Sequence, residues 1–256
     1  NSNLSSENLR NIKGIGWKDN DGNLIINNPE SIVPQERMDI DLPGYAWDLL
    51  PMKKTPLDLY RSHVWHGDFN ENIRTPYAAI YTSLGCAFGC EFCMINILNR
   101  TDNSENISSG DSRIMRFWSV EWVLRQFKIL RELGVSTIRI SDEMFLLNHN
   151  YYEPICKGLV ERDYGLHMWA YSRVDTARGK FLDLVSNAGI KWLALGIEAG
   201  SQMVRQEVSK GSFKEVNIRK ITSMINEHNI NIIANYIVGF PEDTYSTMTS
   251  TLNLAL

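Results

Sequence analysis

The chain has 256 residues, of which 43% are hydrophobic and 22% charged, a composition typical of a folded globular protein and not of a disordered or collagen-like chain. Its 26 Lys and Arg residues against 30 Asp and Glu residues give a formal net charge of −4, so charge does not favour nucleic acid as a partner. No apolar run approaches the roughly 18 residues of a membrane span. The chain begins at Asn1 and stops inside a predicted helix, so we expect it to be a fragment of a longer protein.

Residues 1–75 show little periodicity and many chain breakers, and we interpret them as an irregular linker before a main domain at residues 76–256. Within the linker, the apolar segments 15–17 and 24–26 flank a polar turn that contains Asp21-Gly22. This pattern predicts a small β-hairpin.

Residues 76–256 alternate between apolar runs and amphipathic stretches. Strands are predicted in chain order at 77–84, 136–141, 166–171, 191–197 and 231–238. Helices are predicted at 120–133, 151–163, 176–188 and 213–228, with a last one starting at 244. Five such repeats predict an α/β fold with a parallel sheet and right-handed crossovers. The pattern leaves open whether the sheet is doubly wound or curls into a barrel.

Polar residues follow every predicted strand. Both architectures bind ligands at the carboxyl ends of parallel strands, so we expect one site that gathers these residues. In chain order, the strand ends carry the cysteines of 86–93, Asp142 with Glu143, Arg173 with Asp175, Glu198 with Ser201, and Gly239 to Glu242.

Three of the four cysteines, Cys86, Cys90 and Cys93, lie within eight residues. Four cysteines do not make a disulfide framework in a chain of this length, whereas clustered thiolates suit iron–sulfur clusters or zinc. A structural zinc site commonly needs a second ligand pair, and a ferredoxin-type cluster has a different spacing. Cys156 lies in a predicted helix, where we expect a core position. The clustered cysteines point to a metal site in a reducing compartment, so we expect a cytoplasmic protein.

The segment Cys86-Ala87-Phe88-Gly89-Cys90-Glu91-Phe92-Cys93 resembles the signature of the radical S-adenosylmethionine (SAM) superfamily, in which an aromatic residue, here Phe92, precedes the third cysteine. The resemblance extends over about residues 76–250. It implies a partial (β/α)6 TIM-like barrel whose sixth strand would lie beyond Leu256. It also implies a 4Fe-4S cluster on the three cysteines, with one iron open to SAM. Reductive cleavage of SAM would give a 5′-deoxyadenosyl radical, with the electron supplied by a low-potential donor such as flavodoxin or ferredoxin.

The same resemblance implies residues that bind SAM. The stretch from Asn235 to Glu242 is similar to the fifth-strand motif behind the adenine, which assigns Gly239, although Asn235 replaces the first glycine of that motif. The fourth-strand segment implies that Glu198 and Ser201 contact the ribose. Glu143 occupies the place of the acidic residue that holds the methionine amino group, without the family's preceding glycines. Arg173 is placed like arginines that pair with the SAM carboxylate. The alternative for Arg173 and Glu198 is a structural ion pair.

The segment 40–52 resembles the linker before the barrel of cobalamin-dependent members, in which a cobalamin-binding domain comes first. The leading hypothesis is therefore a cobalamin-dependent C-methyltransferase acting on a small molecule. A methylthiotransferase or a rearrangement enzyme is the alternative within the superfamily. Methylthiotransferases normally carry further N-terminal cysteines, and residues 1–75 have none. A non-catalytic iron–sulfur or zinc-binding protein is the rival outside it. The polar segment 94–118 adjoins the cysteines and is a candidate cover for the substrate.

Overall fold

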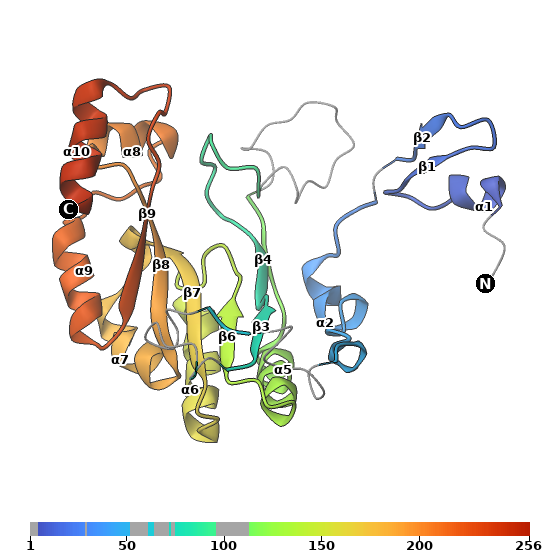
Figure 1. The fold of residues 1–256 in the computed structure, drawn as a ribbon, viewed down its shortest axis with the longest axis horizontal. Coiled ribbons are helices and arrows are strands. Elements are labelled where there is room, and N and C mark those ends of the chain that lie inside the picture. The colour runs from blue at the N-terminus through green and yellow to red at the C-terminus, as the bar shows by residue number, and fades with distance from the viewer. Residues whose placement is uncertain (1–4, 29, 52–60, 64–71, 73–74, 96–112) are drawn as a thin grey trace.

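A computed structural model describes residues 5–28, 30–51, 61–63, 72, 75–95 and 113–256 (Figure 1). Most of the candidate cover, residues 96–112, lies outside these ranges. No helix in the described ranges is long and apolar enough to cross a membrane.

A parallel five-stranded sheet forms the centre of the fold (Figure 1). Its strands, in spatial order, are β3 (Tyr77–Ile80), β6 (Thr137–Ile140), β7 (His167–Arg173), β8 (Ile190–Glu198) and β9 (Asn231–Tyr236). Each strand pairs with the next parallel strand along the chain, so the order contains no reversal. A doubly wound sheet reverses its strand order, whereas a barrel does not. The structure thus confirms the α/β fold and decides for a partial barrel.

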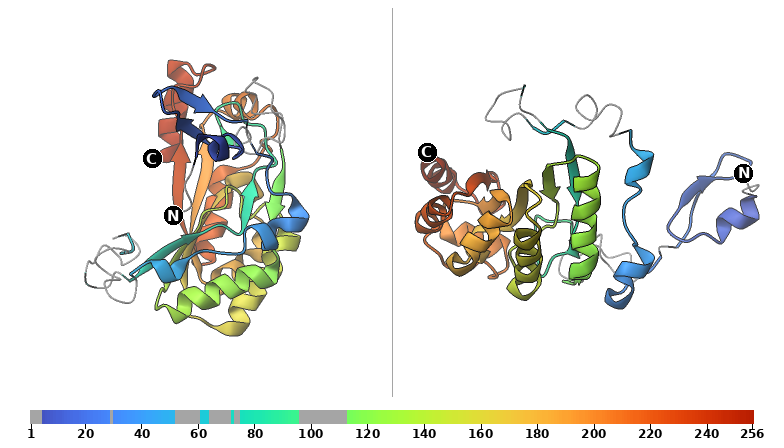
Figure 2. Two further views of the ribbon diagram at one scale, coloured as in Figure 1. Left: turned by 90° about the vertical axis from the view of Figure 1, so that its right-hand side faces the viewer. Right: turned by 90° about the horizontal axis from the view of Figure 1, so that it is seen from below.

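The helices α5 (Val120–Glu132), α6 (His149–Arg162), α7 (Gly179–Asn187) and α9 (Ile218–Glu227) pack against one another in sequence and form one row beside the sheet (Figure 2). The last helix, α10 (Tyr245–Ala255), begins after its N-cap Thr244. The core lies between sheet and helices, where Ile138, Ile140, Phe127, Ile155 and Leu193 are fully buried. The helices therefore occupy one face of the sheet.

The predicted helices agree with the structure at α5, begin two residues too late at α6, and differ at three other places. The hydroxyl of Ser119 caps α5 by accepting a hydrogen bond from the Trp122 amide. The helix predicted from 176 begins only at Gly179, after a 3-10 turn. The helix predicted from 213 begins at Ile218, because Asn217 caps it. The short helix α8 (Gln202–Val208) was not predicted.

The strand predicted over 77–84 is wrong in extent, because it is divided into β3 and β4 (Ser83–Gly85). β4 leaves the parallel sheet and pairs antiparallel with β5 (Met115–Phe117). The cause is the buried carboxylate of Asp142, which accepts hydrogen bonds from the Thr82 amide at 2.6 Å and the Ser83 hydroxyl at 2.6 Å. These bonds turn the chain out of the sheet just before the first cysteine.

The linker is more regular than predicted. The predicted hairpin is confirmed as β1 (Gly16–Lys18) and β2 (Leu24–Ile26), which pair antiparallel. Two short helices, α1 (Ser6–Arg10) and α2 (Met38–Asp41), and two 3-10 turns, at 35–37 and 47–49, complete it. The hairpin stands apart from the sheet in Figure 1.

Residues 33–49, here called the strap, lie across the amino-terminal half of α5. The indole N–H groups of Trp118 and Trp122 each donate a 2.9 Å hydrogen bond, to the carbonyls of Leu42 and Pro43 respectively. Trp47 of the strap is buried in the same core. Buried indoles that find partners fix position as well as add apolar contact. The strap is therefore an integral part of the fold around α5.

Candidate functional site

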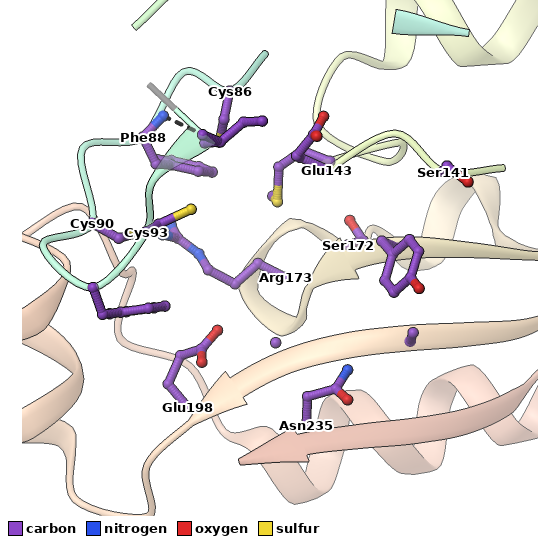
Figure 3. A pocket seen from close by; sticks show the side chains of 16 residues that line it. Cys86, Phe88, Cys90, Cys93, Ser141, Glu143, Ser172, Arg173, Glu198 and Asn235 are labelled. Atoms are coloured by element: carbon purple, nitrogen blue, oxygen red, sulfur yellow. Dashed lines mark hydrogen bonds between the residues drawn. The ribbon is translucent and has the colours of Figure 1, made fainter. Parts of the chain in front are cut away.

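The cysteine loop, residues 86–93, follows β4 directly and lies at the carboxyl ends of the parallel strands. All four cysteines are free thiols; Cys86 is buried, and Cys90 and Cys93 are half-buried. The backbone amide of Phe88 donates to the Cys86 sulfur at 3.5 Å (Figure 3), and the Cys93 amide donates to the Cys90 carbonyl at 3.2 Å. These local bonds shape a tight loop around the three thiols.

Helix α8 braces the cysteine loop from outside. The Glu91 amide donates a 2.9 Å hydrogen bond to the carbonyl of Val208 at the end of α8. The ring of Phe92 lies 5.2 Å from the ring of Phe240, which packs with Val208 in a small apolar cluster. Phe92, the aromatic residue of the motif, therefore packs the cysteine loop against the segments that follow β8 and β9.

A cavity of about 410 Å³ opens beside the cysteine loop (Figure 3). Its walls contain seven of the residues predicted from the sequence: Cys86, Cys90, Phe92, Cys93, Glu143, Arg173 and Glu198. Tyr171 and Ser172 of β7 also line it, and the sequence analysis missed both. The signal for Tyr171 is its place two residues before Arg173, since alternate residues of a strand share a face.

Two further predicted residues, Ser201 and Gly239, are not among those that line the cavity. The Ser201 hydroxyl caps α8 by accepting a hydrogen bond from the Val204 amide. Gly239 has a φ of +91°, in the left-handed region that glycine adopts without strain, and its amide donates to Asp243 at 2.9 Å. Both residues therefore shape the chain next to the cavity wall.

Arg173 is buried, and its main partner is not the one expected. Its Nε and Nη2 donate to the two carboxylate oxygens of Asp175 at 2.6 and 2.8 Å. The guanidinium also lies 3.7 Å from the ring centroid of Phe88 and 4.6 Å from that of Phe213. The ion pair of Arg173 in the described residues is thus with Asp175, not Glu198. Asp175 already uses Nε and Nη2 of Arg173, while Nη1 makes a long 3.4 Å contact with the Ser212 hydroxyl and the side chain also hydrogen-bonds the Cys90 thiol.

Two carboxyl groups reach the cavity from different strands, and Arg173 lies between them in the view of Figure 3. Burial raises the pKa of Glu143 to about 7 and that of Glu198 to about 7. Among the described residues, Oε2 of Glu143 is buried and has no hydrogen-bond partner. A buried acceptor without a donor is costly, so this oxygen fits a ligand that brings an N–H group, such as an ammonium.

Glu198 ends β8 in an unusual conformation. Its φ is +68°, a region that costs a side-chain-bearing residue free energy, and the pairing of β8 with β9 shifts register at this point. A Cβ atom at Gly196 would lie 2.4 Å from the Glu198 Oε1. The missing side chain at Gly196 therefore makes room for the carboxylate in the cavity wall.

The donor set fits an iron–sulfur cluster. The three thiols line one cavity, and thiolates are the ligands that hold such clusters. In a four-iron cluster each cysteine binds a different iron, so three thiols leave the fourth iron open. Burial raises the pKa of the Cys86 thiol to about 11, so binding as a thiolate releases a proton.

Several relatives cover nearly the whole chain. An uncharacterized methyltransferase of Pyrococcus horikoshii is 26% identical over 248 residues, 96% of this chain and 47% of its own length. A protein of Methanocaldococcus jannaschii that is named a methylthiotransferase is 24% identical over 249 residues, 91% of this chain and 45% of its own length. The chain therefore spans about half the length of these relatives.

Among solved structures, the cobalamin-dependent SAM radical enzyme OxsB with aqua-cobalamin bound superimposes with a TM-score of 0.64 at 20% identity, covering 96% of this chain and 32% of OxsB. This likeness supports the fold. The model of the Radical SAM superfamily matches residues 80–255, more than half of the chain and all of the cysteine loop and sheet ends. The chain belongs to the radical SAM superfamily.

Proposed function

We propose that this chain is the SAM-binding core of an enzyme that cleaves SAM reductively to methionine and a 5′-deoxyadenosyl radical, and that the whole protein is a cobalamin-dependent C-methyltransferase. Membership of the superfamily implies a 4Fe-4S cluster and SAM. The observation that carries the proposal is the common cavity, which brings the three motif thiols together with the carboxylates of Glu143 and Glu198.

The cysteine loop holds the cluster in this proposal, through Cys86, Cys90 and Cys93. A bound cluster supplies the single electron that breaks a carbon–sulfur bond of SAM. Phe92 keeps the loop against the rest of the fold through its contact with Phe240. The protein's own work is to position the ligands and to keep water out of the cavity.

The remaining residues orient SAM. Glu143 accepts a hydrogen bond from the methionine ammonium through its unpartnered Oε2, while Glu198 binds the ribose hydroxyls. Arg173 offers Nη1 to the methionine carboxylate, because Asp175 already uses its other edge. Ser201 and Gly239 support the ribose and adenine ends from the turns that follow β8 and β9.

The proposal of cobalamin-dependent methyl transfer is supported by the names of two similar proteins. The Pyrococcus protein is named a methyltransferase, and OxsB is named cobalamin-dependent. We propose that residues 1–75 link an upstream cobalamin-binding domain to the core at residues 76–256. The substrate is a small molecule, and flavodoxin or ferredoxin donates the electron in the cytoplasm. A methylthiotransferase is the second candidate because of the Methanocaldococcus relative; its further cluster ligands would have to come from outside this chain.

The test uses the whole protein, reconstituted anaerobically with iron and sulfide. We expect about four irons and an equal amount of sulfide per chain, since one 4Fe-4S cluster contains four of each. After reduction with dithionite, chromatography should show 5′-deoxyadenosine formed from SAM. A protein that binds zinc alone, or that holds its full cluster and yields no 5′-deoxyadenosine, would refute the proposal. Mass spectrometry of the product separates methyl from methylthio transfer.

A further inference from the structure

The face of the sheet that points away from the helices carries an arginine among aromatic rings. On β6, Ile138 and Ile140 are buried in the core, so Arg139 between them points to the opposite face. In the strand register Arg139 lies opposite Trp169 of β7, and Trp169 lies opposite Trp192 of β8. A charged residue and two indoles therefore occupy one layer of this face, and the ring of His63 packs edge-on against Tyr77 and Trp169 beside them.

Arg139 has no acidic partner in the described residues. Its Nε donates to the Ser141 hydroxyl at 2.9 Å, and its guanidinium carbon lies 5.7 Å from the centroid of the Trp169 ring. By contrast, the other arginine of this face, Arg173, is neutralised by Asp175. The half-buried Arg139 thus presents a positive charge whose Nη atoms have no described hydrogen-bond acceptor.

A second donor lies on the same face. Tyr77, two residues before Ala79, shares the face of that residue, which is the register partner of Arg139 on β3. The hydroxyl of Tyr77 is buried and has no hydrogen-bond partner among the described residues. The charge of Arg139 lowers the pKa of Tyr77 against the larger raising effect of burial, so the two groups are close enough to interact. Hydrogen-bond donors that lack an acceptor in a buried place are costly, so the Arg139 and Tyr77 groups fit a ligand with negatively charged oxygens.

This layer lies directly beneath the proposed SAM cavity. Ser141 and Tyr171 line the cavity, and Arg139 and Trp169 precede them by two residues on the same faces of their strands. Two residues of a strand span about 6–7 Å. A molecule that reaches from the cavity to Arg139 therefore needs only the length of a small organic acid.

We propose that Arg139 anchors an anionic group, carboxylate or phosphate, of the substrate. The inference rests on the proposed function and names its substrate class. A guanidinium binds both anions through paired N–H donors. Anchoring at Arg139 holds the rest of the substrate toward the cavity, on the side of the cysteine loop.

The experiment measures binding of three probes of one size to the whole cluster-loaded protein by calorimetry: phenylacetate, phenyl phosphate and phenylacetamide. We expect at least one anion to bind at least ~10-fold more tightly than neutral phenylacetamide, since charge-assisted bonds are worth this much. Arg139→Gln should abolish that preference, Arg139→Lys should keep part of it, and Tyr77→Phe should weaken the anion a few-fold. Arg131→Gln, on the exposed side of α5, is the matched control and should behave as the wild type.

Equal binding of phenylacetamide and both anions, binding of no probe, or a preference that survives Arg139→Gln would overturn the inference. If Arg139→Gln does not fold, the Arg139→Lys and Tyr77→Phe affinities decide in its place. Whichever anion binds more tightly identifies the group as carboxylate or phosphate. Formation of 5′-deoxyadenosine by the wild-type protein is measured separately, so failure of the SAM chemistry and failure of this substrate class remain distinguishable.

Discussion

The hydroxyl of Tyr45 accepts a 2.7 Å hydrogen bond from the backbone amide of Tyr81, and so ties the strap to the link between β3 and β4. The next residue along the chain, Thr82, is held by the buried carboxylate of Asp142. Cys86 follows after β4. One short segment therefore connects the strap, the sheet and the cysteine loop, and a change in the strap can reach the metal-binding loop through it.

Tyr45→Phe removes the acceptor and keeps the ring. We expect a loss of about 0.5–1.5 kcal/mol at this contact, because a neutral hydrogen bond contributes that much on balance. Hydrogen exchange measured by NMR should show the Tyr81 amide exchanging several-fold faster. Tyr245→Phe is the control, since Tyr245 is 86% exposed and lies far along the chain. Unchanged exchange at Tyr81 would contradict a role of this bond in holding the link.

Replacing any one of Cys86, Cys90 or Cys93 by Ala should abolish cluster assembly, whereas Cys156→Ala should not. Cys156 is fully buried in α6, and burial raises its pKa to about 12, so it stays a protonated, inert thiol. Iron analysis and the visible absorbance after reconstitution provide the measurement. Loss of iron from a folded Cys156→Ala protein would show that the ligand set is wrong.

Arg173→Ala should destabilise the fold by about 3–5 kcal/mol, because it leaves the carboxylate of Asp175 buried without its partner. Denaturant unfolding measures the change. Removing both charges with Arg173→Ala and Asp175→Asn together should recover part of the loss. The exposed Arg178→Ala is the control and should change stability by less than about 0.5 kcal/mol. A stable Arg173→Ala protein would mean that the ion pair contributes little to the fold.

Two substitutions at Glu198 distinguish backbone strain from a contribution to SAM binding. Glu198→Gly and Glu198→Ala both remove the carboxylate, but only Gly relieves the cost of the φ of +68°. We expect the Gly variant to be more stable than the Ala variant by about 1 kcal/mol, measured by denaturant unfolding. Both should bind SAM at least ~10-fold more weakly in calorimetry if the carboxylate contacts the ribose. SAM affinity unchanged in both variants would leave Glu198 with a structural role alone.

The raised pKa of Glu143 predicts how the stability of the fold changes with pH. Burial raises its pKa to about 7 in the folded protein, while the unfolded chain has the ordinary value near 4.3. Between these values the folded state binds more protons, so this group makes stability fall as pH rises from about 4.3 to 7. Glu143→Gln should flatten that slope in unfolding experiments without ligand.

The SAM affinity should change in the opposite direction, because only the ionised carboxylate of Glu143 attracts the ammonium. Calorimetry should show tighter binding as pH rises through about 7, and Glu143→Gln should weaken binding above that pH. Glu198 titrates in the same range, so the Glu143→Gln and Glu198→Gln single variants are compared with the double variant. A SAM affinity independent of pH in the wild type would contradict the assignment.

Local patterns determined much of this protein. The spacing of Cys86, Cys90 and Cys93 with Phe92 indicated the metal-binding loop, because ligand spacing on one short loop is a property of adjacent residues. The helix predicted at 120–133 agrees closely with α5, since helix periodicity acts within a few residues. Alternation of strands and helices predicted the parallel sheet and placed Glu143, Arg173 and Glu198 at its carboxyl ends.

Tertiary structure alone decided what depends on segments far apart in sequence. The division of 77–84 into two strands follows from Asp142, whose carboxylate comes 60 residues after Thr82. Phe213 lies outside α9, and its ring centroid is 4.6 Å from the guanidinium of Arg173, a contact that local sequence pattern does not reveal. Local sequence pattern likewise did not predict that Arg139 lies on the sheet face away from the helices, with no acidic partner among the described residues. A buried charge is satisfied by whichever group the fold brings to it, and only three-dimensional packing determines which donors and acceptors meet.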